Sequence, residues 1–309
     1  MNAPATSHIN FMGLRRITAT VSVVLILVSI VALLTRGLNF GIDFTGGVLL
    51  EAGYPESADL VQIRQTLAEN DFGTAQVQNF GTSKDVLIRL LPVEGVNNAQ
   101  LGEQILSVLR ETEEGVELRR IEFVGPQVGE ELTEQGGLAM LFALLMILAY
   151  IMFRFQWKFA IGSVAALVHD VIITLGIFSL LQLPFDLSVL AALLAVIGYS
   201  LNDTIVVFDR IRENFREARE GSAEKIMNTS INQMLTRTVV TSLTTLLVLL
   251  ALALLGGEAV NGFAIALIIG VVVGTYSSVF TASACALTLN VTPEDLIPSL
   301  KDEEFDDLP

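Results

Sequence analysis

Two charged residues stand where the sequence is otherwise apolar. Asp203 lies near the end of one long apolar stretch, and Arg237 lies at the start of the next. An aspartate inside a membrane span costs roughly 2.5 kcal/mol or more, so it faces other helices or a wet cavity. Desolvation favours the protonated carboxyl and a nearby arginine favours the charged one, so a carboxyl held between them can bind and release an ion. The alternative is a permanent ion pair that joins two helices.

Polar neighbours follow both residues at helical spacing. Tyr199 and Ser200 share the face of Asp203, and Arg237 heads a polar stripe that we expect to face other helices rather than lipid: Gln233, Arg237, Thr241, Thr244 and Thr245. Arginine keeps its proton under these conditions, so Arg237 would act as a fixed charge that responds to Asp203. The simpler alternative is an arginine that extends to the lipid headgroups.

A second ionisable pair, His169 and Asp170, lies in the middle of another apolar stretch. Histidine suits a proton relay because its charge changes near neutral pH. It serves equally as a hydrogen-bonding contact between helices, and both alternatives stay open. Adjacent residues diverge by about 100° around a helix, so this pair does not have the spacing of metal ligands. The sequence indicates no metal site, cofactor, catalytic nucleophile or nucleotide fingerprint, hence no enzyme.

The composition is that of a polytopic α-helical membrane protein. Hydrophobic residues make up 52% of the 309 residues and charged residues 17%, whereas soluble domains carry about 25% charged residues. The net charge of −15 argues against nucleic acid as a partner. Apolar residues gather in six blocks of bilayer length, for which we expect six transmembrane helices: 17–34, 138–153, 159–183, 187–208, 238–255 and 264–287.

The distribution of Lys and Arg predicts the orientation. One set of loops carries Arg15 and Arg16, then Arg154 and Lys158, then the basic residues of 209–237, while the short loops at 183–187 and 256–262 carry none. By the positive-inside rule both termini are cytoplasmic and the long polar segment is periplasmic. The expected order is a cytoplasmic N-terminus, helix 1, the periplasmic segment, helices 2 to 6 and an acidic cytoplasmic tail: 1–16, 17–35, 36–137, 138–290 and 291–309. Residues 1–14 and the tail are expected to be disordered.

The polar segment 36–137 is predicted to be a small α+β domain. Its apolar periodicity gives the order β-α-β-β-α-β, which is the ferredoxin-like pattern. Ser57 is the expected cap of the first helix. In the last strand the apolar phase slips between Leu118 and Ile121, which predicts a β-bulge. Such a sheet buries one face only.

Glycine-rich connectors flank this domain at 39–47 and 124–132. Glycine permits tight turns and close backbone approach, so we expect rigid or hinged links to the membrane helices. The first connector contains the motif residues Gly41, Asp43, Thr45, Gly46 and Gly47.

Two further segments have recognisable patterns. Within the cytoplasmic segment 209–237, the run 209–220 pairs opposite charges at helical spacing, which predicts an amphipathic helix at the membrane surface. Gly221 breaks it, and Ser222 can cap a second short helix. The segment serves either as a solvated linker or as a docking surface for a partner. In the last span Gly270, Gly274 and Ser278 form a ridge of small residues that suits close helix packing, with a partner subunit as one candidate neighbour.

Several of these segments resemble the SecF family of protein-export membrane subunits. The sequence FGIDFTGG at 40–47 is similar to the family signature, and similar stretches are ALVHDV at 166–171, GYSLNDTIVVFDRIREN at 198–214 and the run 228–238. The resemblance covers the chain except its ends, and the stretch 198–214 is the most specific match.

The resemblance implies half of an RND-type bundle, completed by SecD, in the inner membrane. It implies an auxiliary role beside the SecYEG channel, with YajC as a further candidate partner and unfolded polypeptide as the cargo. Asp203 and Arg237 correspond to the membrane charges that couple export to the proton motive force, although the sequence leaves protons and sodium ions both open. Two alternatives are an RND-like permease for a lipid or small hydrophobic substrate, and an assembly factor whose charges are structural.

Overall fold

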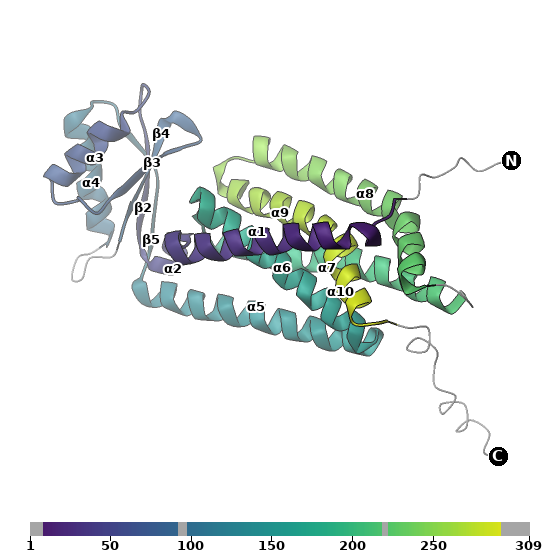
Figure 1. Cartoon of the computed structure of the whole chain (residues 1–309). Helices are drawn as coiled ribbons and strands as arrows, with labels where there is room; N and C mark the ends of the chain where they lie inside the picture. The colour runs from purple at the N-terminus through teal and green to yellow at the C-terminus, as the bar shows by residue number, and fades with distance from the viewer. Residues whose placement is uncertain (1–8, 92–97, 218–221, 292–309) are drawn as a thin grey trace, which may run out of the picture.

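Six long helices form a bundle with a small α+β domain at one end (Figure 1). The computed structural model describes residues 9–91, 98–217 and 222–291. The long helices are α1 (Arg15–Arg36), α5 (Pro126–Arg154), α6 (Trp157–Leu181), α7 (Leu187–Glu217), α8 (Ala223–Leu255) and α9 (Glu258–Ser277). A π-helical turn (Ser278–Ala282) and α10 (Ser283–Thr288) extend α9. Each of the six is long and apolar enough to cross a membrane.

The bundle has an inner and an outer set of helices. About half of the apolar stretch of α6, α7 and α9 is buried, whereas α1, α5 and α8 leave most of theirs exposed. Exposed apolar side chains such as Leu34, Phe153 and Leu255 need lipid or a partner subunit around them. The inner helices therefore hold the polar groups that a bilayer would not accept.

The first helix begins earlier than its apolar block. The expectation of a disordered segment up to residue 14 is wrong for residues 9–14, while residues 1–8 lie outside the described part of the chain. Phe11 and Met12 are buried, and a short 3-10 turn (η1, Met12–Leu14) leads into α1. Side-chain oxygens of Asn232 and Asn228 on α8 accept bonds from the amides of Ile9 and Met12. These two bonds attach the segment 9–12 to α8.

The charged run after Asp203 is not a separate surface helix. α7 continues unbroken from Leu187 to Glu217, and Phe208, Ile211 and Phe215 keep one face buried. Ser222 does cap the next helix, accepting a bond from the Lys225 amide, but α8 is 33 residues long rather than short. The acidic tail from residue 292, together with residues 218–221, lies outside the described residues.

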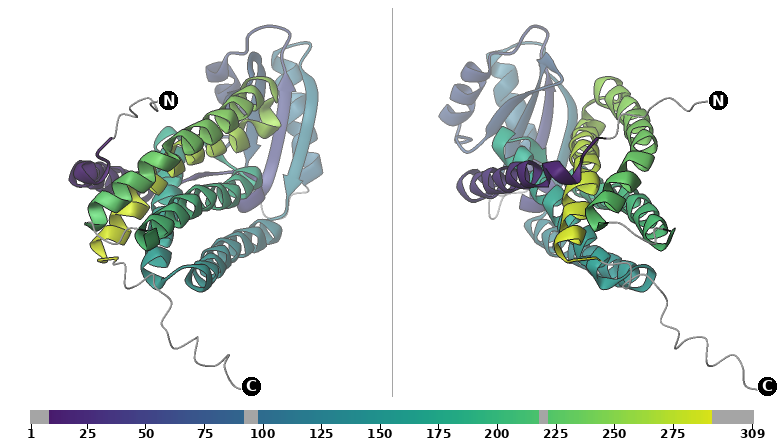
Figure 2. Two further views of the ribbon diagram at one scale, coloured as in Figure 1. Left: turned by 90° about the vertical axis from the view of Figure 1, so that its right-hand side faces the viewer. Right: turned by 45° about the vertical axis from the view of Figure 1, so that its right-hand side comes forward.

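The domain has the expected element order. Strands β2 (Gly47–Gly53), β3 (Gln76–Phe80), β4 (Thr82–Leu90) and β5 (Glu117–Val124) form an antiparallel sheet in the order β3-β4-β2-β5. Helices α3 (Leu60–Glu69) and α4 (Asn98–Thr112) cover one face, and the ends of the bundle helices lie near the other (Figure 2). The buried residues of the domain core include Val48, Leu50, Ile88, Ile105 and Leu109.

Two local predictions in the domain can be compared with the structure. The predicted bulge is confirmed: Glu51 pairs with Arg120 and Ala52 with Leu118, which leaves Arg119 as the extra residue. The predicted cap is wrong, because Asp59 rather than Ser57 accepts the amides of Val61 and Gln62 at the start of α3.

Candidate functional site

Asp203 lies on α7 with its side chain buried. It is 5% exposed, and its Oδ2 atom has no hydrogen-bond partner. Buried polar atoms are nearly always bonded, so an open carboxylate oxygen is an exception that needs an explanation. Ser200, one turn earlier on the same face, and the adjacent Thr204 are also buried. The arrangement leaves one oxygen available to a proton or a cation.

Arg237 lies on α8, which packs along α7. It is within electrostatic range of Asp203. Within the described residues no ion pair joins the two side chains, so the alternative of a permanent ion pair finds no support there. The side chain of Arg237 is exposed.

The polar stripe of α8 is not covered within this chain. Four of its members are exposed, namely Gln233, Arg237, Thr241 and Thr244, and Thr245 is half-buried. The expectation that this stripe faces other helices is therefore wrong for the helices of this chain. Hydroxyl groups of its threonines bond back to the helix's own carbonyls. Helices of a second subunit could still cover the stripe.

His169 and Asp170 lie on α6 at the centre of a buried network. The Asp170 Oδ1 atom is 2.9 Å from His169 Nδ1, and Oδ2 accepts bonds from the hydroxyls of Ser200 on α7, at 2.6 Å, and Ser277 on α9, at 2.7 Å. His169 Nε2 is 3.2 Å from the hydroxyl of Ser22 on α1. Both members of the pair are about 98% buried. One carboxylate thus links three inner helices and, through His169, a fourth.

Sequence reasoning missed the partners of this pair. Ser22 and Ser29 are both buried on α1. In the sequence, their spacing of seven residues places them on one helix face, which is the signal that could have pointed to Ser22. Tyr276 and Ser277 follow Gly274, whose missing side chain lets α9 approach Ser200. A Cβ atom at Gly270 would lie 2.1 Å from Val196. The small-residue ridge of α9 therefore packs against α7 of the same chain, not against a second subunit.

The first connector forms a joint between the domain and the bundle. Strand β1 (Asn39–Phe40) pairs in parallel with β6 (Pro184–Phe185), which lies just before α7. The short helix α2 (Ile42–Thr45) follows. Its Asp43 accepts a bond from the amide of Leu187, the first residue of α7, at 2.9 Å. A carboxylate at a helix N-terminus is stabilised by the helix dipole.

Glycines allow the backbones in this joint to touch. Gly46 and Gly47 have φ values of 68° and 122°, and a Cβ atom at Gly47 would lie 2.1 Å from the Leu90 carbonyl oxygen. A Cβ atom at Gly129 would lie 2.8 Å from the Phe44 carbonyl oxygen. Gly129 belongs to α5, which begins at Pro126, so the second expected connector is mostly helix. Thr45 closes α2 by donating to the Gly41 carbonyl.

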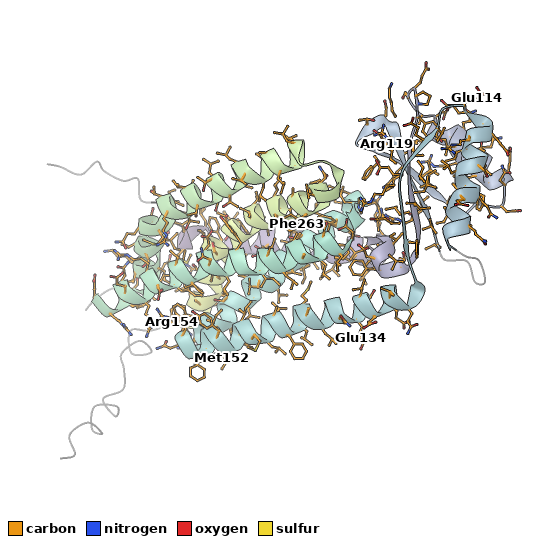
Figure 3. All side chains as sticks on the ribbon, turned by 180° about the vertical axis from the view of Figure 1, so that it is seen from behind. Glu114, Arg119, Glu134, Met152, Arg154 and Phe263 are labelled. Carbon is orange, nitrogen blue, oxygen red and sulfur yellow. The ribbon has the colours of Figure 1, made fainter. Side chains whose placement is uncertain are left out.

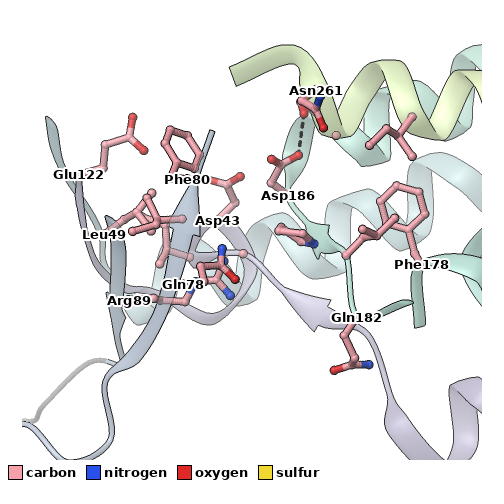
Figure 4. A pocket seen from close by; sticks show the side chains of 18 of the residues that line it. Asp43, Leu49, Gln78, Phe80, Arg89, Glu122, Phe178, Gln182, Asp186 and Asn261 are labelled. Atoms are coloured by element: carbon pink, nitrogen blue, oxygen red, sulfur yellow. Dashed lines mark hydrogen bonds between the residues drawn. The ribbon is translucent and has the colours of Figure 1, made fainter. Parts of the chain in front are cut away.

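A cleft of about 540 Å³ opens between the uncovered face of the sheet and the joint (Figure 4). Arg89 of β4 lies in its wall and is 9% exposed, donating to the Phe40 carbonyl at 2.7 Å and to Asn39. Burial lowers the pKa of the Arg89 guanidinium, while Asp186 and Asp43 act in the opposite direction. No motif or periodicity in the sequence had singled out Arg89 or Asp186.

Basic side chains gather at the end of the bundle away from the domain. Arg154, at the end of α5, pairs with Asp209, and Arg15 pairs with Glu224. Figure 3 shows Arg154 at that end and Glu114 and Arg119 on the domain at the other. In the described parts of the chain, no cluster of three His, Cys, Asp or Glu residues is placed to hold a metal ion.

Comparison with known proteins identifies the family. Residues 104–292 match the model of the SecD/SecF protein-export membrane protein, C-terminal, and residues 31–54 match the SecD/SecF GG motif. The protein translocase subunit SecF of Vibrio alginolyticus is 52% identical over 99% of this chain and 98% of its own length. That of Pseudomonas aeruginosa is 49% identical over 97% of this chain and 98% of its own length.

A solved structure agrees with the sequence matches. The crystal structure of SecDF, a translocon-associated membrane protein from Thermus thermophilus, superposes with a TM-score of 0.85 at 37% identity. The match covers 94% of this chain and 40% of that longer one, so the present chain corresponds to a part of it. SecDF in its super-membrane-facing form gives a lower TM-score of 0.69 over the same shares. With a family model over most of its length and relatives at about half identity, the chain belongs to the SecD/SecF family of protein-export membrane proteins, on its SecF side.

Proposed function

We propose that this chain is an auxiliary subunit of the Sec protein translocase that uses an ion gradient to promote polypeptide export. The observation that carries the proposal is the buried carboxyl of Asp203, whose Oδ2 has no partner while the positive charge of Arg237 lies within range. A buried carboxyl that changes its proton changes the charge inside the bundle, and the fixed arginine responds to that change. The ion is a proton in this proposal, and sodium is an outcome of the test.

The exposed stripe of α8 supports SecD as the partner. Arg237 and three other polar stripe residues lie on a surface that lipid would cover in the isolated chain. Charged groups in membranes face other protein or water, so this surface calls for the helices of a second subunit. The longer SecDF chain has room for such a half, since this chain matches 40% of it. In the complete assembly the Asp203–Arg237 pair would sit between the two halves.

We place both termini in the cytoplasm and the α+β domain in the periplasm. Support comes from the basic side chains at the end of the bundle opposite the domain, including Arg15, Arg16, Arg154 and Arg210. The element order and the strand order β3-β4-β2-β5 support a ferredoxin-like domain. Its uncovered sheet face and the 540 Å³ cleft lie on the side where exported polypeptide would emerge. SecYEG, with YajC as a further candidate, completes the proposed assembly.

The Asp203→Asn variant tests coupling. Asparagine has nearly the same size but cannot exchange a proton at that position. We expect the variant to co-purify with SecD in normal amounts and to lose export driven by the proton gradient by on the order of tenfold or more. Replacing the proton gradient with a sodium gradient identifies the ion. Full export by assembled Asp203→Asn would refute ion coupling through this carboxyl.

A further inference from the structure

A chain of hydroxyl groups leads from His169 to the backbone of α1. At its far end, the hydroxyl of Tyr276 on α9 lies 2.8 Å from the carbonyl oxygen of Thr18. A carbonyl oxygen can only accept, so Tyr276 gives its single proton to Thr18. The Tyr276 ring also stacks on the imidazole of His169, with centroids 6.0 Å apart. The direction of every other bond in the chain follows from this fixed end.

The next link is Ser22. Its hydroxyl is 3.1 Å from the Tyr276 hydroxyl, whose proton is already used, so Ser22 is the donor. The Thr281 hydroxyl, at 3.5 Å, can donate its own proton to Ser22. Since the proton of Ser22 points at Tyr276, the 3.2 Å contact with His169 is a bond only if Nε2 carries a proton. The hydroxyl chain therefore requires Nε2–H.

The other side of the imidazole fixes a second proton. Nδ1 of His169 and Oδ1 of Asp170 are 2.9 Å apart, and one proton must lie between two atoms that otherwise present lone pairs. Asp170 Oδ2 already accepts two serine protons. The pair thus holds two protons and has no net charge, whether the shared proton belongs to the ring or to the carboxyl. A neutral pair is what a membrane interior favours.

We propose that His169 and Asp170 form a proton-binding pair that keeps both protons and anchors α1 to the bundle, rather than passing a proton to Asp203. The chain of donors ends on the Thr18 carbonyl, which cannot hand a proton onward. Loss of the Nε2 proton breaks the bond to Ser22 that links α6 to α1, and loss of the shared proton removes the bond that orients the imidazole toward Ser22. His169 and Asp170 are therefore positioning residues. This inference deepens the proposed function, because it assigns ion exchange to Asp203 alone.

Few other titratable groups face the pair. Among the described residues, α9 contributes Tyr276, and α7 contributes Asp203 one turn beyond Ser200. The charged residues of α1 and α5 lie toward their ends, and α10 carries Cys285. None of these places a permanent charge in the hydrogen-bond chain. The proton count of the pair is thus set mainly by its own bonds.

The Asp170→Asn variant separates an anchor from a relay. The asparagine amide can donate to Nδ1 while its oxygen accepts from Ser200 and Ser277, and Nε2 keeps its proton. The substitution therefore copies the neutral, two-proton state but cannot cycle. We expect export to stay within roughly threefold of the parent chain, because every link to α1 survives. Export as low as in Asp203→Asn, with normal assembly with SecD, would overturn the anchor and establish a relay.

A charge-rescue pair gives a second test. His169→Phe leaves the Asp170 carboxylate buried with two serine donors and no counter-charge, so the amount of assembled protein should fall. Adding Asp170→Asn removes that charge and should raise the amount again by roughly fivefold or more, although it restores no lost bond to Ser22. No gain in the double variant would contradict a pair whose role includes charge neutrality. Asp203→Asn, run alongside, reports separately on coupling.

Nitrogen-15 NMR of the imidazole observes the proton directly. His8→Gln leaves His169 as the single histidine of the chain. In the complete assembly with SecD we expect the ring to carry a proton on Nε2 and to share a second proton between Nδ1 and Asp170. Absence of the Nε2–H signal would overturn the proposal. Its persistence in Asp203→Asn as well would show that the pair holds its protons without help from the coupling carboxyl.

Discussion

The two buried carboxyls of the bundle have opposite surroundings. Asp170 uses both oxygens, with His169, Ser200 and Ser277 as partners, whereas Asp203 leaves Oδ2 without one. Ser200 and Asp203 are one helical turn apart on α7, so the contrast arises within a few ångströms of the same helix. A fully bonded carboxyl stabilises one arrangement of helices. An incompletely bonded carboxyl can be stabilised in more than one protonation state, which is what coupling to an ion requires.

The same contrast separates two larger regions. The joint around α2 is closed: backbone bonds, Asp43 and glycines that allow direct contact tie the domain to α5 and to the start of α7. The outer face of α8, with Arg237, is exposed and makes no such contacts with the other described residues. Both regions contact α7: its first residue, Leu187, is bonded to Asp43 of the joint, and α8 packs along it near Asp203, whose Oδ2 atom has no partner. A change at Asp203 would therefore be transmitted to the joint through a continuous helix.

The largest expected difference concerns stability at the two carboxyls. His169→Ala removes a partner from the closed one and leaves a buried charge, which should destabilise the chain by about 3–5 kcal/mol. Asp203→Asn should change the free energy of unfolding by less than about 1 kcal/mol, since the Asp203 carboxyl forms no hydrogen bond with the other described residues that the substitution would remove. Thermal unfolding of the purified proteins in detergent compares them.

A matched control lies on the same helix as His169. The Ser163 hydroxyl is buried without a partner, so Ser163→Ala removes a polar group from α6 at little cost. Equal destabilisation by His169→Ala and Ser163→Ala would mean that burial alone, not pairing with Asp170, sets the effect.

The second prediction concerns the closed joint. Gly47→Ala places a Cβ atom against the Leu90 carbonyl at a φ of 122°, where strain costs about 1–3 kcal/mol. We expect a lower unfolding temperature and faster protease cleavage near the connector. Gly137→Ala is the control: it lies in exposed α5 with open space around it, and alanine there should be neutral or stabilise the helix by up to about 1 kcal/mol. Matching behaviour of the two variants would show that the joint is not rigid.

The open site was easier to predict from the sequence than the closed regions. Asp203 and Arg237 stood out because a charge in an apolar block is conspicuous whatever surrounds it. The bulge at Arg119 followed from a local change of phase. In contrast, a serine such as Ser22 carries no signal for a partner on a helix about 250 residues away, and only packing of α1 on α6 and α9 gives it one.

Long-range packing also explains the wrong predictions. Arg89 lies on the face of β4 away from the domain core, and only the contact with the joint buries it, so no local pattern could have indicated its role. The charged run after Asp203 suggested a surface helix. No glycine or proline interrupts 199–220, however, and the buried Phe208 and Phe215 keep the run on the axis of α7. The stripe of α8 was assigned to a surface that faces other helices because its polar residues share one helix face, but in the described part of the chain four of its five members are exposed.

The third prediction weakens one bond of the joint. Asp43→Asn removes the negative charge from the N-terminus of α7 but keeps an oxygen that can accept from the Leu187 amide. The expected loss is about 0.3–1 kcal/mol, visible as faster hydrogen exchange at Leu187. Asp186 accepts a hydrogen bond from the Val189 amide in the same first turn of α7, and this bond should limit the loss of stability. Unchanged exchange at Leu187 would mean that the dipole contributes nothing there.

The smallest stability effect is expected at Arg237, where the functional effect should be large. Its side chain is exposed and forms no ion pair with the other described residues, so Arg237→Leu should alter the unfolding free energy of the isolated subunit by no more than about 0.5 kcal/mol. With SecD present, the same variant should lose proton-driven export, and Arg237→Lys should restore part of it because the fixed positive charge returns. Thermal unfolding with and without SecD, beside an export assay, checks both statements. If Arg237→Leu destabilised the isolated subunit as strongly as Gly47→Ala, the α8 face would be part of the closed structure, and the contrast between a fixed joint and an open coupling site would fail.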